Sequence, residues 1–125
     1  MIRKYPKKKK KLLSKKRFED KVHLHFVASM QCCFKTMKIS QNCKGPTQAH
    51  HLLRPWDGVR GMGMKSSDRN VIPLCMYHHG LLHTKYGSEK AFFEAYGLTE
   101  NIGKILARNL WEDHNPEDID SDIPF

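Results

Sequence analysis

The stretch TQAHHLLRPWDGVRGMGMKSSDRNVIPLCMYHHGLLH, residues 47–83, contains five of the chain's eight histidines. The segments "QAHHLL" (48–53) and "NVIPLC" (70–75) are predicted to form two short strands. Between them, residues 54–69 carry a proline and three glycines and show no periodicity. A loop of this length in a compact domain is usually functional. The stretch therefore predicts a strand–loop–strand unit with histidines on both sides of the loop.

Helices are predicted after this unit. Residues 77–86 look helical up to Gly87, and Ser88 can cap a second helix over residues 89–96. Residues 100–114 form a third helix, whose apolar stripe consists of Ile102, Ile105, Leu106 and Leu110. The core beneath these helices is expected to contain Phe92, Phe93, Tyr96, Leu110 and Trp111.

A short amphipathic helix is also predicted before the unit, over residues 18–30. Its apolar stripe follows the spacing i, i+4, i+8 and consists of Val22, Phe26 and Met30. His23 and His25 lie off this stripe and are expected at the surface. Residues 31–47 are expected to be irregular.

The charge is unevenly placed along a chain whose formal net charge is +9. Residues 1–21 carry eleven lysines and arginines against two acids, and the last fourteen residues carry six acids and no lysine or arginine. We therefore expect a disordered lysine-rich arm over residues 1–17, one folded domain over residues 18–114 and an acidic tail over residues 115–125. A basic arm on a basic body suggests a polyanion partner. The alternative is a solvated tail or a targeting signal.

The composition also bounds the compartment and the source of stability. The hydrophobic share is 39%, so the core is modest for 125 residues. No segment reads as a membrane span or a secretory signal, which favours a cytoplasmic protein with no membrane partner. Four cysteines in a reducing compartment favour metal ligation over disulfides.

One candidate metal site combines cysteines with a histidine. Its ligands are Cys75 and His78, two residues apart as structural zinc sites require, together with Cys43 and either Cys32 or Cys33. The gap between the first two ligands is nine or ten residues, where two to four are usual. A zinc ion here would stabilise a small core. The alternative is that small cysteines simply pack in that core.

A second candidate site consists of histidines alone. His79 and His83 stand at i and i+4, so both imidazoles project from one helix face. His50 and His51 are adjacent on a strand and point to opposite faces, so one of them can reach the helix. Burying such a residue without a partner is costly. The alternative is that all four lie on the surface.

The order "AHH", then Asn70, then "PLC-x-x-HH-x-x-x-H" resembles that of the HNH endonucleases, whose ββα-metal motif is a hairpin packed on a helix. "GMGMKSSDRNVIPLCMYHHGLLH", followed by "FFEAYG", is similar to the phage and bacterial group around the phage recombination-enhancement nucleases. The resemblance covers about residues 22–111. It implies an α+β fold with a hairpin–helix core, flanking helices and a structural zinc. The family usually has a cysteine where His78 stands, and a close Cys-x-x-Cys pair where this chain has its long gap.

The resemblance implies roles for five residues. His51 would be the general base that deprotonates a water, for which a pKa near neutrality is suitable. His50 and His79 fall on metal-ligand positions of the motif, and His83 matches a further ligand of the nuclease colicins. Asn70 would pin the loop backbone or orient His51.

A divalent ion on the three ligand histidines would offset the charge that grows on the leaving oxygen. An all-imidazole set suits zinc, nickel, cobalt or manganese better than magnesium, although magnesium becomes plausible if His83 only supports the helix. The candidate catalytic ions are thus Mg²⁺, Mn²⁺, Ni²⁺ and Zn²⁺, beside a structural Zn²⁺.

Several basic residues are candidates for binding DNA phosphates. They are Lys65, Arg60 and Arg69 on the loop between the strands, and Lys7, Lys8, Lys9, Lys10 and Lys11 in the arm. The alternative for the loop is a flexible exposed segment. Asp68 is expected to close a turn, and Trp56 to anchor the loop rather than stack on a base.

The leading hypothesis is a metal-dependent HNH endonuclease that cuts or nicks DNA with weak sequence selectivity, leaving a 5′-phosphate and a 3′-hydroxyl as the family does. The alternative is a non-catalytic, zinc-stabilised DNA-binding module, an accessory to recombination. The resemblance also suggests a nuclease that acts on a recombinase–DNA filament in a bacterial or phage-infected cell. No feature of the sequence fixes an oligomeric state.

Overall fold

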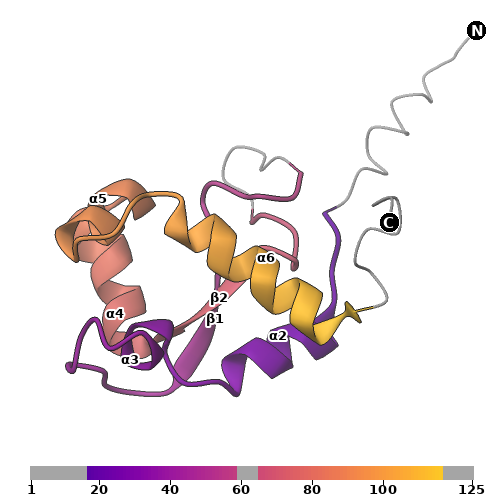
Figure 1. Cartoon of the computed structure of the whole chain (residues 1–125), viewed down its shortest axis with the longest axis horizontal. Helices are drawn as coiled ribbons and strands as arrows, with labels where there is room; N and C mark the ends of the chain where they lie inside the picture. The colour runs from indigo at the N-terminus through magenta and orange to yellow at the C-terminus, as the bar shows by residue number, and fades with distance from the viewer. Residues whose placement is uncertain (1–16, 59–64, 117–125) are drawn as a thin grey trace, which may run out of the picture.

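The computed structural model describes residues 17–58 and 65–116. Within these ranges the fold is α+β, with one two-stranded antiparallel sheet, which confirms the α+β part of the predicted fold class (Figure 1). The strands are β1 (Thr47–His51) and β2 (Val71–Cys75). The helices are α2 (Lys21–Ala28), α3 (Cys33–Thr36), α4 (Met76–Leu81), α5 (Glu89–Ala95) and α6 (Ile102–His114), and a π-helical turn η1 (Leu82–Tyr86) continues α4.

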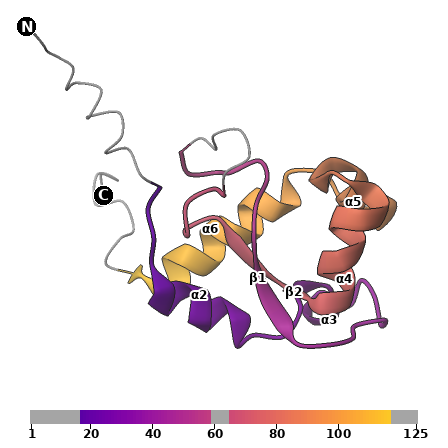
Figure 2. The same cartoon turned by 180° about the vertical axis from the view of Figure 1, so that it is seen from behind.

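The hairpin and α4 form a continuous strand–strand–helix unit. β1 and β2 pair so that Thr47 lies opposite Cys75 and His51 opposite Val71. β2 is buried along its whole length, whereas burial varies along β1, where Gln48 is exposed. α4 follows β2 without a linker, because Cys75 caps it: the backbone N–H of His78 donates to the Cys75 thiol. Figure 2 shows the hairpin from the side opposite α6.

The buried face of α2 differs from the predicted stripe. His23 and Val27 are fully buried, whereas Val22 is 71% exposed. The buried face follows the same i, i+4 spacing, displaced by one residue, because α2 packs on the end of α6 through His23. The His23 ring lies edge-on to Trp111, and its Nδ1 is 2.9 Å from Nδ1 of His114. The expectation that His23 lies at the surface was therefore wrong.

The segment between α2 and β1 is more ordered than predicted. Residues 33–36 form α3, which places Phe34 in the core. The Phe34 ring stacks on Phe92 of α5, with 5.2 Å between ring centroids. This contact joins the N-terminal segment to the helical layer, so α3 is stabilised by packing and not by its own four residues.

The last helix also uses a different face from the one predicted. The buried residues of α6 are Gly103, Ala107 and Trp111, whereas Ile105 is 52% exposed. A Cβ atom at Gly103 would lie 3.0 Å from Leu52 Cδ2 and 3.1 Å from Phe93 Cε2. Small residues on this face thus let α6 lie close to the end of β1. Within the described ranges, no helix is both long and apolar enough to cross a membrane.

Candidate metal centres

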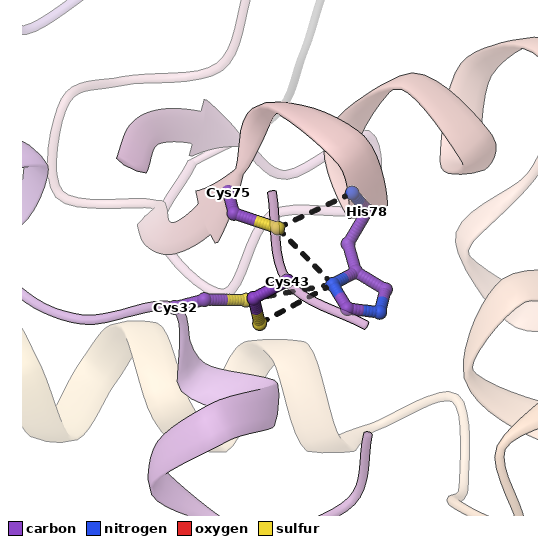
Figure 3. Close-up of side chains that lie close together, drawn as sticks. All are labelled: Cys32, Cys43, Cys75 and His78. Carbon is purple, nitrogen blue, oxygen red and sulfur yellow. Dashed lines mark hydrogen bonds between the residues drawn. The ribbon is translucent and has the colours of Figure 1, made fainter. Parts of the chain in front are cut away.

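A cluster of three cysteines and one histidine lies at the junction of α3, β2 and α4 (Figure 3). The Nδ1 atom of His78 is 3.2 Å from Sγ of Cys75, 3.7 Å from Sγ of Cys43 and 3.8 Å from Sγ of Cys32. A tetrahedral zinc site with Zn–S near 2.3 Å and Zn–N near 2.0 Å separates its ligand atoms by roughly 3.5–3.8 Å. The cluster can therefore hold a metal ion such as zinc.

The surroundings of this cluster suit a structural ion. Cys32 and Cys75 are buried and His78 is fully buried. The second ring nitrogen of His78, Nε2, lies 3.0 Å from the Ser40 hydroxyl. Such a contact fixes which nitrogen faces the metal. All four possible ligands thus come from the segment between α2 and β1 or from the β2–α4 junction.

The structure separates two adjacent cysteines that the sequence left as alternatives. The Cys32 thiol points into the cluster, whereas Cys33 begins α3 and lies in the hydrophobic core. A hydrogen bond from the Cys33 thiol lowers the pKa of Cys32 to about 4. The same hydrogen bond, followed by burial, raises the pKa of Cys33. Because metal-bound cysteines are thiolates, a low pKa favours Cys32 as a ligand.

A short turn closes the long gap between Cys32 and Cys43. Gly45 has φ +81°, and a Cβ atom there would lie 2.8 Å from Met76. Both the left-handed backbone and the close approach require glycine. The backbone N–H of Tyr77 donates to the carbonyl of Lys44, so this turn is fixed to the first residues of α4.

Three histidines converge on the neighbouring side of α4. Nδ1 of His50 and Nε2 of His83 each lie 3.1 Å from Nε2 of His79. Burial, followed by the charges of His50 and His83, lowers the pKa of His79 to about 4. Burial likewise lowers the pKa of His83. Neutral imidazoles with three converging nitrogens are what a divalent ion needs from its ligands. The predicted group of three is therefore assembled, although the identity of an ion on it stays a prediction.

Two residues that the sequence analysis missed contact the ring nitrogens of these histidines that point away from the cluster. Glu89, at the start of α5 and 5% exposed, has Oε2 2.8 Å from Nε2 of His50. The same carboxylate accepts from the backbone N–H of Arg54 at 3.1 Å. Gln48 has Oε1 2.7 Å from Nδ1 of His79. Each contact leaves the nitrogen that faces the cluster free to donate its lone pair.

His51 has a carboxylate partner of its own. Nε2 of His51 lies 2.7 Å from Oδ1 of Asp68, which is 1% exposed. Asp68 also accepts from the Arg17 guanidinium at 2.7 Å, and its Oδ2 accepts from the backbone N–H of Asp20 at 2.7 Å. The pKa of His51 is lowered by burial, against the raising effect of Asp68. The expectation that Asp68 merely closes a turn therefore missed its main contact.

Asn70 organises the loop between the strands. Its Oδ1 accepts from the backbone N–H groups of Trp56 at 2.8 Å and Asp57 at 3.0 Å. Its Nδ2 donates to the Asp57 carbonyl at 3.0 Å and to the Ser67 hydroxyl at 3.0 Å. Asn70 was predicted either to pin the loop backbone or to orient His51, and these contacts fit the first role. The Trp56 indole N–H donates to the carbonyl of Arg69, so Trp56 anchors the loop as expected.

The predicted nucleic-acid residues differ in their surroundings. Lys65 is exposed. The guanidinium of Arg69 lies 3.3 Å from a carboxylate oxygen of Asp57 and 3.9 Å from the centre of the Phe18 ring, so it supports the loop. The other predicted contacts fall outside the described residues: Arg60, Lys7, Lys8, Lys9, Lys10 and Lys11.

Comparison with known proteins places the chain in a family but assigns it no activity. No curated protein and no solved structure matches the chain. A family model described as "Protein of unknown function (DUF968)" matches residues 5–110, which include both clusters and the His51–Asp68 pair. The chain belongs to this family.

Proposed function

We propose that the protein is a metal-dependent endonuclease of the HNH type, which hydrolyses phosphodiester bonds of DNA with weak sequence selectivity. The observation that carries this proposal is the convergence of His50, His79 and His83 on one side of α4, with His51 next to His50 and held by Asp68. A cation site and a base held by a carboxylate, to which consecutive residues of β1 contribute, are the two components that phosphodiester hydrolysis requires. The hairpin–helix unit would then be the ββα-metal core.

His51 would act as the general base. Its Nε2 is engaged by Asp68, which leaves Nδ1 to accept a proton from the attacking water. A carboxylate on one nitrogen fixes the tautomer in which the other nitrogen carries a lone pair. The lowered pKa keeps the ring neutral near pH 7, and therefore able to accept that proton. Asp68 orients the ring and stabilises the imidazolium that forms.

His50, His79 and His83 would hold the catalytic ion, which is Mg²⁺, Mn²⁺, Ni²⁺ or Zn²⁺. The bound ion supplies Lewis-acid stabilisation of charge on the leaving oxygen. Glu89 and Gln48 keep the ligand nitrogens of His50 and His79 aimed at the site. Imidazole ligands favour nickel or zinc over magnesium.

The Cys32–Cys43–Cys75–His78 cluster would hold a structural Zn²⁺ that stabilises the lobe next to the active site. His78 and His79 are neighbours on α4, so one ion would stabilise the helix that carries ligands for the other. We place the protein in the cytoplasm of a bacterial or phage-infected cell. There DNA is the substrate, and a recombinase–DNA filament is a further partner.

The test is nicking of supercoiled plasmid DNA with each of the four ions in turn, by wild type and by His79→Ala. We expect nicking by the wild type that a chelator stops and one of the ions restores. His79→Ala should lose it while keeping its structural zinc and its helical circular dichroism. Activity that His79→Ala retains with every ion would remove the three-histidine site from the mechanism.

The competing function is a non-catalytic, zinc-stabilised DNA-binding module that assists recombination. The Cys3His cluster favours it, because that cluster alone suffices to stabilise a small fold. Such a module has no use for a base held by a buried carboxylate beside His50. DNA binding without nicking by any of the four ions would favour the module.

A further inference from the structure

The segment that carries the first two cysteine ligands is basic and has no carboxylates nearby in sequence. No aspartate or glutamate occurs between residues 21 and 56. Residues 31–46, which we call the zinc lobe, include three exposed lysines: Lys35, Lys38 and Lys44. None of the three forms an ion pair with a residue that the structure describes. The lobe therefore presents uncompensated positive charge.

Several basic residues elsewhere are compensated. Lys90 pairs with Glu94 on α5 at 3.0 Å, and Arg108 pairs with Glu112 on α6 at 3.0 Å. The guanidinium of Arg54 lies 4.0 Å from Glu100. Four other lysines form no ion pair within the described residues either, and each lies on a different segment: Lys21, Lys65, Lys85 and Lys104. The lobe differs because it carries three such lysines within residues 31–46, so a polyanion meets a local positive patch there.

The surface of the lobe is hollowed between these lysines. One hollow, of about 320 Å³, is lined by Lys35, Lys38, Ser40, Gln41 and Cys43. A second, of about 230 Å³, shares Lys35 and Cys43 with the first and adds Lys44. Ammonium, hydroxyl and amide donors around a concave surface match the oxygens of a phosphate.

The lobe backbone is held in place by the metal-ligand segments. The N–H of Lys35 donates to the carbonyl of Cys32 at 2.9 Å. The carbonyl of Lys44 accepts from the N–H of Tyr77 at 3.1 Å, and the carbonyl of Pro46 accepts from the N–H of Met76 at 2.9 Å. Two of the lysines therefore stand on backbone that is fixed beside Cys32 and Cys43. Binding would cost little backbone ordering.

We propose that Lys35, Lys38 and Lys44 bind phosphates of the DNA backbone, so that the zinc lobe is a DNA-binding surface separate from the loop between the strands. The proposal rests on the DNA partner of the proposed function, although not on its chemistry. β1 leads from the lobe at Thr47 to the proposed base at His51, a distance of roughly 13 Å for four residue steps. That distance corresponds to roughly four base-pair steps of duplex. The lobe would thus hold the strand to one side of the scissile phosphate.

A charge argument distinguishes this role from simple compensation of the cluster. A zinc ion with three thiolates and a neutral imidazole leaves one net negative charge. Three lysines exceed that charge, and the excess is available to a ligand. If compensation were their role, neutralising them would change zinc retention and leave DNA affinity unaltered.

The test compares two charge-matched triple variants in a His51→Ala background, which prevents cleavage during the measurement. One is Lys35→Gln/Lys38→Gln/Lys44→Gln, and the control is Lys90→Gln/Lys104→Gln/Arg108→Gln on α5 and α6. Affinity for a fluorescent duplex of mixed sequence is measured over a range of salt concentrations, and bound zinc is counted. We expect the lobe variant to lose about tenfold or more in affinity and to lower the salt slope by about three, because each phosphate contact contributes close to one. The control should stay within about threefold, and both should retain zinc.

Equal losses in the two variants would overturn the proposal, because net charge alone would then explain binding. An unchanged affinity of the lobe variant, or a loss confined to zinc content, would overturn it as well. Nicking is measured separately with the unmodified His51. Lobe-dependent binding by a wild type that nicks no DNA would remove the nuclease and leave this surface standing. Nicking by the wild type, together with unaltered DNA affinity in the lobe variant, would remove this surface and leave the nuclease standing.

Discussion

Nε2 of His51 lies 2.7 Å from Oδ1 of Asp68, and this one carboxylate also binds the Arg17 guanidinium and the backbone N–H of Asp20. The proposed base is therefore attached to the N-terminal segment through a single buried side chain. Asp68 sits only two residues before Asn70, which pins the rest of the loop. One loop thus aligns the base and joins the segment before α2 to the hairpin.

The first prediction concerns this carboxylate. Asp68→Asn can present an amide N–H to Nε2 of His51, which would move the ring proton to Nδ1 and remove the lone pair needed by the base. We expect nicking to fall by roughly 10²–10⁴-fold, the contribution of a general base. The control is Asp57→Asn in the same loop, whose carboxylate contacts Arg69 and Ser67 and not His51. Similar rates for the two variants would argue against the positioning role of Asp68.

The second prediction uses two adjacent cysteines that differ in position. Cys32→Ala removes a thiol from the cluster, whereas Cys33→Ala removes one from the hydrophobic core. We expect Cys33→Ala to keep the zinc content of the wild type and Cys32→Ala to lose one zinc per chain and unfold at lower temperature, because ligand loss removes binding energy that stabilises the fold. Metal analysis of the purified variants checks this. Full zinc content in Cys32→Ala would remove that residue from the site.

The third prediction concerns the buried carboxylate behind His50. Glu89→Gln keeps the size of the side chain but weakens its hold on Nε2 of His50. We expect the affinity of the three-histidine site for Mn²⁺ or Ni²⁺ to fall by about 10–100-fold. Titration calorimetry on the zinc-loaded protein measures it, with Glu94→Gln on the exposed side of α5 as the control. A Glu89→Gln variant that binds the ion like the wild type would contradict the assigned role.

The fourth prediction is a pH dependence of stability. Burial, followed by the charge of His114, lowers the pKa of His23 from 6.5 to about 4. Between these values the unfolded chain binds a proton that the folded chain resists, so stability is lost as the pH falls from 6.5 towards 4. We expect His23→Gln to remove up to about 2 kcal/mol of the loss between pH 7 and pH 5.

Urea denaturation at the two pH values measures this loss. His25→Gln, on the exposed side of α2, should behave like the wild type. Release of a metal ion from the cluster by acid would be common to all three proteins, so the comparison between variants carries the result. An unchanged pH dependence in His23→Gln would show that the His23 ring titrates normally in the folded protein.

Much of the fold follows from local pattern. The two strands, the helices around residues 77–86 and 89–96 and the glycine stop at Gly87 were predicted from turn residues and flanking polar groups. The buried faces of α2 and α6 were not, because neither follows its most apolar stripe. In α2 a histidine is buried against α6, and in α6 small residues face the core so that the helices approach closely. Such choices depend on tertiary partners and not on periodicity.

The candidate site, like the fold, could be predicted from the sequence only in part. The spacing of histidines and cysteines predicted which residues gather, and both groups are assembled. Glu89, Gln48 and Asp68 were missed as partners, because a lone acidic or amide residue far along the chain carries no spacing signal. Their role appears only when α5 and the loop fold back on β1. Metal-binding and catalytic histidines commonly have a carboxylate partner, so a search for such partners among the few acids of the domain could have found Glu89 and Asp68.

The most direct test of the account is the initial rate of plasmid nicking by wild type and His51→Ala, measured with the ion that supports activity. His25→Ala, an exposed histidine on α2, is the matched control. The account predicts a loss of about 10²–10⁴-fold in His51→Ala alone, with zinc content and DNA affinity unchanged. Equal rates in the three proteins would contradict the assignment of His51 as the base, and with it the proposed nuclease site.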